Sequence, residues 1–193
     1  MHPNGYRVRD YTSSDEPSWL RCRVLSFLTS TYFDDVVTTK PTIKAPGFEL
    51  VAINTDDAVV GLMDVTISDM VGTIDNLAVH PEHQQRGIAR SLLAHAITRA
   101  HAQSLTELSA WTRDDPGTLH WYRTMGFTDT DHYLHVFADH NADPAEPDRA
   151  VDAMLPGLQL MSAFLHAELA HEKQLRRRFT RVHVCRRFTK TLN

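Results

Sequence analysis

The sequence has few cysteines and no long apolar run. Of its 193 residues only Cys22 and Cys185 are cysteines. They form no closely spaced pair of metal ligands, and nothing requires them to be bonded. No apolar stretch is long enough to span a bilayer. The first residues also lack the basic-then-apolar layout of a signal peptide. We therefore expect a cytoplasmic protein with no membrane partner.

The chain has no excess of basic residues. It carries 20 lysines and arginines against 24 aspartates and glutamates, which gives a formal charge of −4. That balance argues against a nucleic-acid partner. Residues 176–178 are all arginine, but no aromatic stacking platform accompanies them. There are no internal repeats, and the 42% hydrophobic content is ordinary for a globular protein. The length suits one domain spanning residues 1–193.

The most informative stretch is residues 73–100. Residues 73–79 read as a strand and residues 80–86 as a polar turn. From Gly87 onward apolar residues recur three or four apart, which is typical of one face of a helix. They are Ile88, Leu92, Leu93, Ala96, Ile97 and Ala100. The pattern predicts a strand, a tight loop and a helix, with glycine at the helix entry.

This helix entry suits an anion. The first N–H groups of a helix have no intrahelical acceptor, and the helix dipole adds positive charge there. Gly87 lets a ligand approach the backbone, and Arg86 and Arg90 add charge at the same end. An ordinary strand–loop–helix unit with an incidental glycine explains the spacing as well, so the spacing leaves both interpretations open.

Two motifs carry a resemblance to a known family. Residues 84–89 (QQRGIA) match the Q/R-x-x-G-x-G/A signature of the GNAT superfamily of N-acetyltransferases. Residues 121–127 (WYRTMGF) resemble the aromatic–Tyr–x–x–x–Gly–Phe motif of that family. Two motifs in the right order are more specific than either alone. The resemblance is strong over about residues 48–137.

The resemblance implies an α+β fold. We expect a mixed, mostly antiparallel sheet of about seven strands flanked by helices. The strands are expected near residues 6–11, 48–53, 58–67, 73–79, 105–112, 131–138 and 181–190. Residues 139–178 depart from a plain family member, because apolar residues from 151 to about 178 recur near helical spacing. We interpret 139–178 as a helical insertion between the last two strands, packed on the domain or across a homodimer.

The resemblance also implies acetyl-CoA as the acyl donor, with no metal. Backbone N–H groups of the polar loop would hold the pyrophosphate, and the edge of the preceding strand would hold the pantetheine arm. A bulge beside the thioester, a feature of the family, would open the sheet there. The residues expected to bind the donor are Leu77, Ala78, Val79, Gln84, Gln85, Arg86, Gly87, Ile88, Ala89, Arg90, Asp115 and Tyr122. Asp115 departs from the asparagine that the family commonly carries at that place.

Direct attack of an amine on a thioester needs an oxyanion donor, a proton for the thiolate and a base. Tyr122 matches the usual proton donor of the family, and the Val79 N–H is the candidate oxyanion donor. Asp75 shares the strand parity of Val79 and is the candidate base, acting directly or through water. His80 and His120 are alternatives, although each is better explained by a structural role.

The acceptor is expected to be the primary amine of a small molecule. In the family, the segment between the first two strands lines the acceptor pocket, so the resemblance makes Tyr32, Phe33, Asp34 and Asp35 candidates for substrate binding. Together with Asp64 and Asp75, the two acids predict a cationic acceptor. A protein N-terminus or lysine as acceptor stays open, and so does a CoA-binding module without activity.

Overall fold

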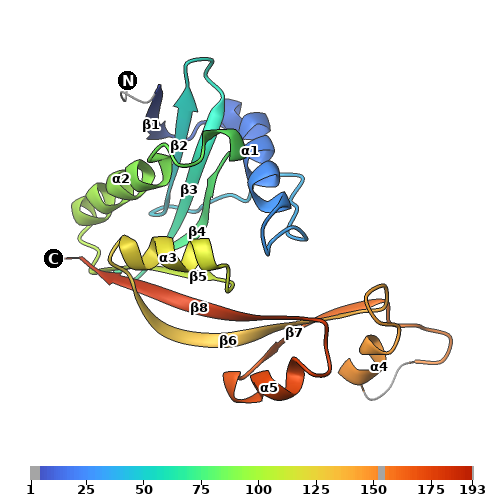
Figure 1. Cartoon of the computed structure of the whole chain (residues 1–193). Helices are drawn as coiled ribbons and strands as arrows, with labels where there is room; N and C mark the ends of the chain where they lie inside the picture. The colour runs from blue at the N-terminus through green and yellow to red at the C-terminus, as the bar shows by residue number, and fades with distance from the viewer. Residues whose placement is uncertain (1–4, 152–154, 193) are drawn as a thin grey trace.

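A computed structural model of the protein describes residues 5–151 and 155–192 (Figure 1). The strands are β1 Tyr6–Asp10, β2 Phe48–Asn54, β3 Val59–Ser68, β4 Val71–Val79, β5 Glu107–Thr112, β6 Thr128–Asp139, β7 Ser162–Ala167 and β8 Arg181–Thr191. The helices are α1 Glu16–Leu28, α2 Ile88–Ala102, α3 Pro116–Thr124, α4 Glu146–Ala150 and α5 Glu172–Leu175. Three short 3-10 turns are η1 Ser13–Asp15, η2 Pro81–His83 and η3 Leu169–His171. Within these described ranges, no helix combines the length and the apolar character needed to cross a bilayer.

The eight strands form one sheet in the order β1-β2-β3-β4-β5-β8-β6-β7. All neighbours run antiparallel except β4 and β5, which run parallel. A parallel pair needs a long crossover, and here α2 supplies it. The predicted α+β class with a mixed, mostly antiparallel sheet is therefore confirmed.

The two faces of the sheet carry different helices. The apolar stripe of α2, which includes Ile88 and Leu92, packs in the larger core together with Ala52 of β2. On the other face, Trp19 of α1 packs in a second core with Val51. Because neighbouring residues of a strand point to opposite faces, β2 contributes to both cores. Figure 1 shows α1 and α2 on either side of β2–β4.

The parallel pair β4–β5 separates part-way along its length. Val71–Ile74 pair with Glu107–Ala110, but β4 continues to Val79 and β5 to Thr112 without further pairing between them. On its other side, β4 has a register shift against β3, because Asp64 pairs with Asn76 and Val65 with Ile74. Asp75 is therefore the extra residue of a β-bulge. We call the region where β4 and β5 no longer pair the β4–β5 splay, and the bulge expected on this strand lies at its start.

The prediction of a helix over residues 151–178 is wrong. Within the described part of that range, β7 pairs with β6, and only α5 is α-helical. In β7, exposed and half-buried residues alternate, which is the two-residue period of a strand. The edge of β6 provides the hydrogen-bonding partner, so this segment forms a strand although its apolar residues also fit a helical spacing. Residues 152–154, part of that predicted helix, lie outside the described residues. The strands that flank the segment, β6 and β8, pair antiparallel with each other.

Candidate active site

The start of α2 has the geometry of an anion site. Gln85 and Gly87 both have positive φ, 61° and 80°, and the helix begins at Ile88. Gly87 is the N-cap and offers no side-chain hydrogen bond, and the first turn contains no acidic residue. The N-cap residue itself therefore supplies no side-chain acceptor for the N–H groups of the first turn. The Arg86 side chain folds back to donate to the Glu82 carbonyl at 3.0 Å.

The edge of β4 presents backbone groups to the splay. The His80 N–H donates to the Val60 carbonyl of β3 at 3.0 Å. Because hydrogen-bonding direction alternates along a strand, the Ala78 N–H also faces β3, while those of Leu77 and Val79 face the splay. The side chain of Gln84 lies against the same edge of β4, because its amide donates to the Val79 carbonyl at 3.3 Å. Ala78 is only 6% exposed and contributes packing.

Tyr122 of α3 packs in the larger core together with residues of α2, beside the β8 residue that pairs with Ala110 of β5. Its ring stacks on Phe188 of β8, with centroids 5.2 Å apart, and meets Phe127 edge-on. Burial raises the pKa of the phenol, so it stays protonated at neutral pH. Asp115 is the N-cap of α3, with its Oδ1 accepting from the Thr118 N–H at 2.7 Å. That carboxylate is committed to its own helix.

Asp75 is exposed at the bulge. Burial of part of its carboxyl raises the pKa, and hydrogen bonds from Thr66 partly offset this. Asp64, on the adjacent strand β3, is more deeply buried, with 1% of its surface exposed. Burial raises the Asp64 pKa to about 6, against the attraction of Lys40 at 3.6 Å. Of the alternative bases, His120 is exposed on α3.

The predicted acceptor residues lie in the loop that follows α1, and this loop reaches both sides of the splay. On the β4 side, Arg23 donates to Asn76 at 3.0 Å and to the Asp35 carboxylate at 2.9 Å. On the β5 side, the Asp34 carboxylate accepts from Arg113 at 3.1 Å and from Arg181 of β8 at 2.8 Å.

Both acids of this loop form ion pairs with arginines. Burial alone would raise the pKa of Asp34, but hydrogen bonds from Arg181 and Arg113 lower it to about 2. Phe33 packs over the Arg181 guanidinium at 4.4 Å. Two members of the carboxylate cluster expected around a cationic acceptor, Asp34 and Asp35, therefore have arginine partners, and the cationic acceptor itself stays a prediction.

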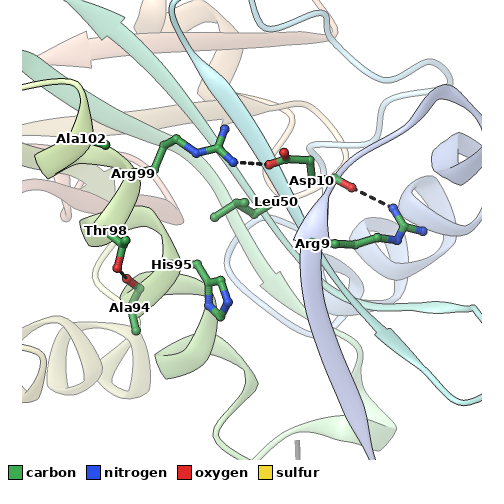
Figure 2. Close-up of a pocket in the computed structure, with 8 residues that line it drawn as sticks. All are labelled: Arg9, Asp10, Leu50, Ala94, His95, Thr98, Arg99 and Ala102. Atoms are coloured by element: carbon green, nitrogen blue, oxygen red, sulfur yellow. Dashed lines mark hydrogen bonds and ion pairs between the residues drawn. The ribbon is translucent and has the colours of Figure 1, made fainter. Parts of the chain in front are cut away.

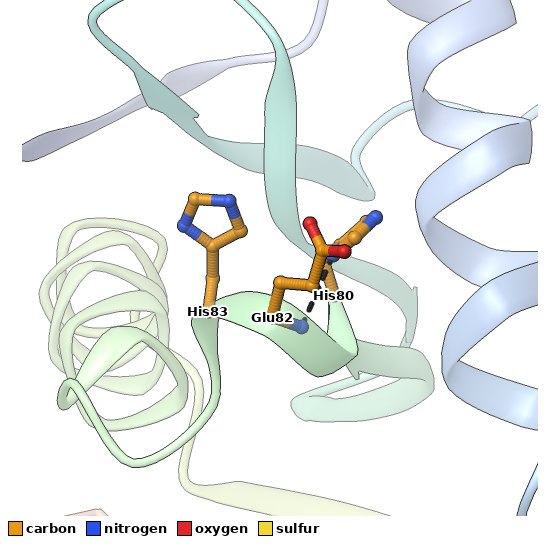
Figure 3. Close-up of side chains that lie close together, drawn as sticks. All are labelled: His80, Glu82 and His83. Carbon is orange, nitrogen blue, oxygen red and sulfur yellow. Dashed lines mark hydrogen bonds between the residues drawn. The ribbon is translucent and has the colours of Figure 1, made fainter.

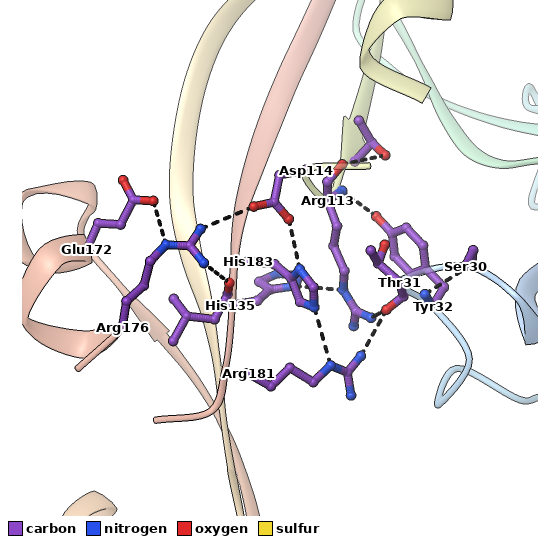
Figure 4. Close-up of polar contacts among 12 residues, drawn as sticks. Ser30, Thr31, Tyr32, Arg113, Asp114, His135, Glu172, Arg176, Arg181 and His183 are labelled. Atoms are coloured by element: carbon purple, nitrogen blue, oxygen red, sulfur yellow. Dashed lines mark hydrogen bonds and ion pairs between the residues drawn. The ribbon is translucent and has the colours of Figure 1, made fainter. Parts of the chain in front are cut away.

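Several polar residues here were missed by sequence reasoning. They are Arg23, Arg113, Asp114, Arg181 and His183. Figure 4 shows Arg113 and Arg181 converging on the Thr31 carbonyl, and Asp114 accepting from His183. They come from three separate segments of the chain, α1, the turn after β5, and β8, so no local motif could have grouped them.

Comparison with known proteins identifies the family. The model of the Acetyltransferase (GNAT) family matches residues 8–127. The chain belongs to this family. It is an N-acetyltransferase of the acyltransferase class EC 2.3.1. A comparison with curated proteins finds no match.

Solved structures agree on the fold of this acetyltransferase. The ribosomal-protein-S18-alanine N-acetyltransferase from Escherichia coli is 10% identical with a TM-score of 0.61, covering 97% of this chain and 94% of that one. The yncA protein from Salmonella typhimurium, solved with its cofactor acetyl-CoA, is 13% identical with a TM-score of 0.58 and the same coverages. The PaiA N-acetyltransferase from Thermoplasma acidophilum, in complex with coenzyme A, is 14% identical with a TM-score of 0.55, covering 65% and 91%. At these identities the likeness is one of fold.

One group of potential metal ligands lies beside the splay. His80, Glu82 and His83 place one ligand atom each within 4.8 Å of one another (Figure 3). His80 Nδ1 accepts from the Glu82 N–H at 3.3 Å, so that ring nitrogen already has a partner in the turn. Metal–nitrogen bonds of about 2.0 Å would require these side chains to turn inward. The absence of a metal stays a prediction for this acetyltransferase.

Two surface hollows lie apart from the predicted donor residues. One, of about 630 Å³, is lined by β1, β2 and α2, and there Arg99 pairs with Asp10 at 2.6 Å (Figure 2). The other, of about 750 Å³, is lined by Trp111, Tyr133, His166 and the start of η3. Neither contains a residue predicted to bind acetyl-CoA.

Proposed function

We propose that this acetyltransferase moves the acetyl group of acetyl-CoA to the primary amine of a small molecule. The observation that carries the small-molecule class is the loop of residues 31–35. It is tied to β4 through Arg23 and to β5 and β8 through Arg113 and Arg181. We infer that a loop held on both sides of the splay would confine the acceptor space and so favour a small molecule over a folded protein.

The residues at the start of α2 fit the pyrophosphate of a CoA donor. The uncapped helix entry supports this fit, because its N–H groups and dipole suit a multiply charged anion. Backbone groups of residues 84–90 would hold the pyrophosphate. The N–H groups of Leu77 and Val79 would bind the pantetheine arm and thioester as an added strand.

The chain supplies each group that direct attack requires. The Val79 N–H would stabilise the oxyanion as the acceptor nitrogen adds to the thioester carbonyl. Tyr122 would give a proton to the departing sulfur, since its raised pKa keeps that proton in place until the C–S bond breaks. Asp75, exposed beside the bulge, would take the proton released by the nitrogen, directly or through water.

A free-thiol release assay tests this function. Wild-type protein is given acetyl-CoA with a panel of small amines and, separately, with peptides that carry free N-termini or lysines. We expect thiol release to depend on a small amine, with acetylated amine found by mass spectrometry. Release with peptides only would contradict the small-molecule class. CoA binding without release on any acceptor would indicate a binding module.

A protein amine is the second candidate acceptor. The hollow beside Trp111, Tyr133 and His166 lies on the same face of the sheet as the acceptor loop, and Trp111 is 37% exposed. Such an aromatic surface suits contact with a peptide. One structural neighbour is, by its name, a ribosomal-protein-S18-alanine N-acetyltransferase. Peptide arms belong in the assay for these reasons.

A further inference from the structure

The loop after α1 brings a second tyrosine, Tyr32, to the splay. The Tyr32 N–H donates to Ser30 Oγ at 3.1 Å, and its ring packs against Phe27 with centroids 5.5 Å apart. The Arg113 guanidinium lies 4.3 Å from the centre of the same ring. These contacts fix the direction of the side chain.

The Tyr32 hydroxyl meets β5 where β4 has ceased to pair with it. Its oxygen accepts from the Arg113 N–H at 2.8 Å, three residues after the last parallel pair at Ala110 (Figure 4). The Thr112 hydroxyl also lies beside this oxygen. A phenol has one donor hydrogen and acceptor lone pairs. The Arg113 N–H uses the oxygen as an acceptor, and the Thr112 hydroxyl donates its own hydrogen to the Arg113 carbonyl at 3.3 Å, so the O–H is the donor that Tyr32 itself offers.

The phenols of Tyr32 and Tyr122 approach the splay from opposite faces. Tyr122 comes from α3 and Tyr32 from the loop after α1. Burial is the main cause that raises the pKa of Tyr122, and the Tyr32 phenol adds to the rise. Burial also raises the Tyr32 pKa, so both phenols carry protons at neutral pH.

We propose that Tyr32 donates a hydrogen bond to the leaving sulfur of the acetyl donor, alongside Tyr122. The inference rests on the proposed acetyl transfer. In that step the acceptor nitrogen bonds to the carbonyl carbon, and the C–S bond breaks with its electron pair going to sulfur. Tyr122 gives the sulfur one proton while Tyr32 stabilises the sulfur through a hydrogen bond, and the proton that Asp75 takes from the nitrogen finally restores the Tyr122 phenol.

Tyr32→Phe removes the hydroxyl and keeps the ring contacts with Phe27 and Arg113. We expect kcat to fall about ten- to a hundredfold, the rate equivalent of one hydrogen bond to a charged atom, at an unchanged Kd for acetyl-CoA. In the double variant with Tyr122→Phe, we expect a smaller loss than the product of the two single losses, because both phenols serve one sulfur. Tyr11→Phe is the matched control, because Tyr11 packs against the second core beside Trp19 of α1. This variant should keep the wild-type kcat.

A role limited to anchoring the loop predicts a different pattern. Ser30→Ala loosens the same loop without touching the phenol, and we expect it to leave kcat within about twofold. Three results would overturn the inference: an unchanged kcat in Tyr32→Phe, a rise in acceptor KM alone, or an equal kcat loss in Ser30→Ala. Wild-type protein that releases no thiol with any amine would overturn the proposed function as well. Active wild-type protein with unaffected Tyr32→Phe would overturn only the role of Tyr32.

Discussion

Two substitutions of Gly87 distinguish the backbone strain caused by a side chain from the electrostatic effect of a negative charge at the predicted pyrophosphate site. At φ 80°, a residue with a side chain costs about 1 to 2 kcal/mol. A Cβ built there would lie 3.7 Å from the Tyr6 hydroxyl, an ordinary contact, so Gly87→Ala adds only that backbone cost. Gly87→Glu adds the same cost and a carboxylate. Against a phosphate about 4 Å away, at an effective dielectric constant of about 20, the repulsion is about 4 kcal/mol.

Urea unfolding and calorimetric titration with CoA measure the two effects separately. Both variants should lose about 1 to 2 kcal/mol of unfolding free energy. Affinity for CoA should fall less than about tenfold in Gly87→Ala and roughly a thousandfold in Gly87→Glu. Folded Gly87→Glu that binds CoA like wild type would refute the site. Equal losses of affinity in both variants would refute the electrostatic reasoning and assign the effect to the backbone.

Three further predictions follow from buried and paired groups. Tyr122→Phe should lower kcat about a hundredfold or more at nearly constant affinity for acetyl-CoA, and an equal loss of affinity would make it a positioning residue. Asp64 binds its proton more tightly in the folded state, with its pKa raised from 3.8 to about 6, so the folded protein loses about 3 kcal/mol of stability as pH rises from about 4 to above 6. Denaturation of Asp64→Asn should show a stability gain over wild type that appears across this pH window, whereas the exposed control Asp56→Asn should show none. Asp34→Asn leaves Arg113 and Arg181 without their shared carboxylate, so acceptor KM should rise while KM for acetyl-CoA stays constant in steady-state kinetics.

The parts of the fold that the sequence predicted are those with a local pattern. The strand, loop and helix of residues 73–100 appear as β4, η2 and α2, because alternation and a helical period are both readable within one window. The donor candidates on this segment therefore lie together, although their binding role remains a prediction.

The parts that failed depend on partners far away in sequence. β7 was interpreted as helix because apolar residues such as Leu165 and Leu169 fit a helical spacing, and only the free edge of β6 decides for a strand. The same limit applies to Arg113 and Arg181, which are 68 positions apart and meet at Asp34. An ion pair between residues so far apart leaves no periodic pattern and no local motif in the sequence from which it could be predicted.

The arginines also change what the acidic loop can do. An unpaired Asp34-Asp35 would attract a protonated amine and hold its proton more tightly, which opposes the attack. In the structure both carboxylates form ion pairs within the protein, with Arg23, Arg113 and Arg181. Two carboxylates that face three arginines give this loop no excess of negative charge, so the loop would not hold a proton on a nearby amine, and the amine must lose that proton before it can attack. The sequence pattern pointed to substrate steering, and that role of the two acids stays a prediction. The structure shows that both acids also hold the loop through their arginine partners, while Asp75 is an exposed carboxylate at the bulge.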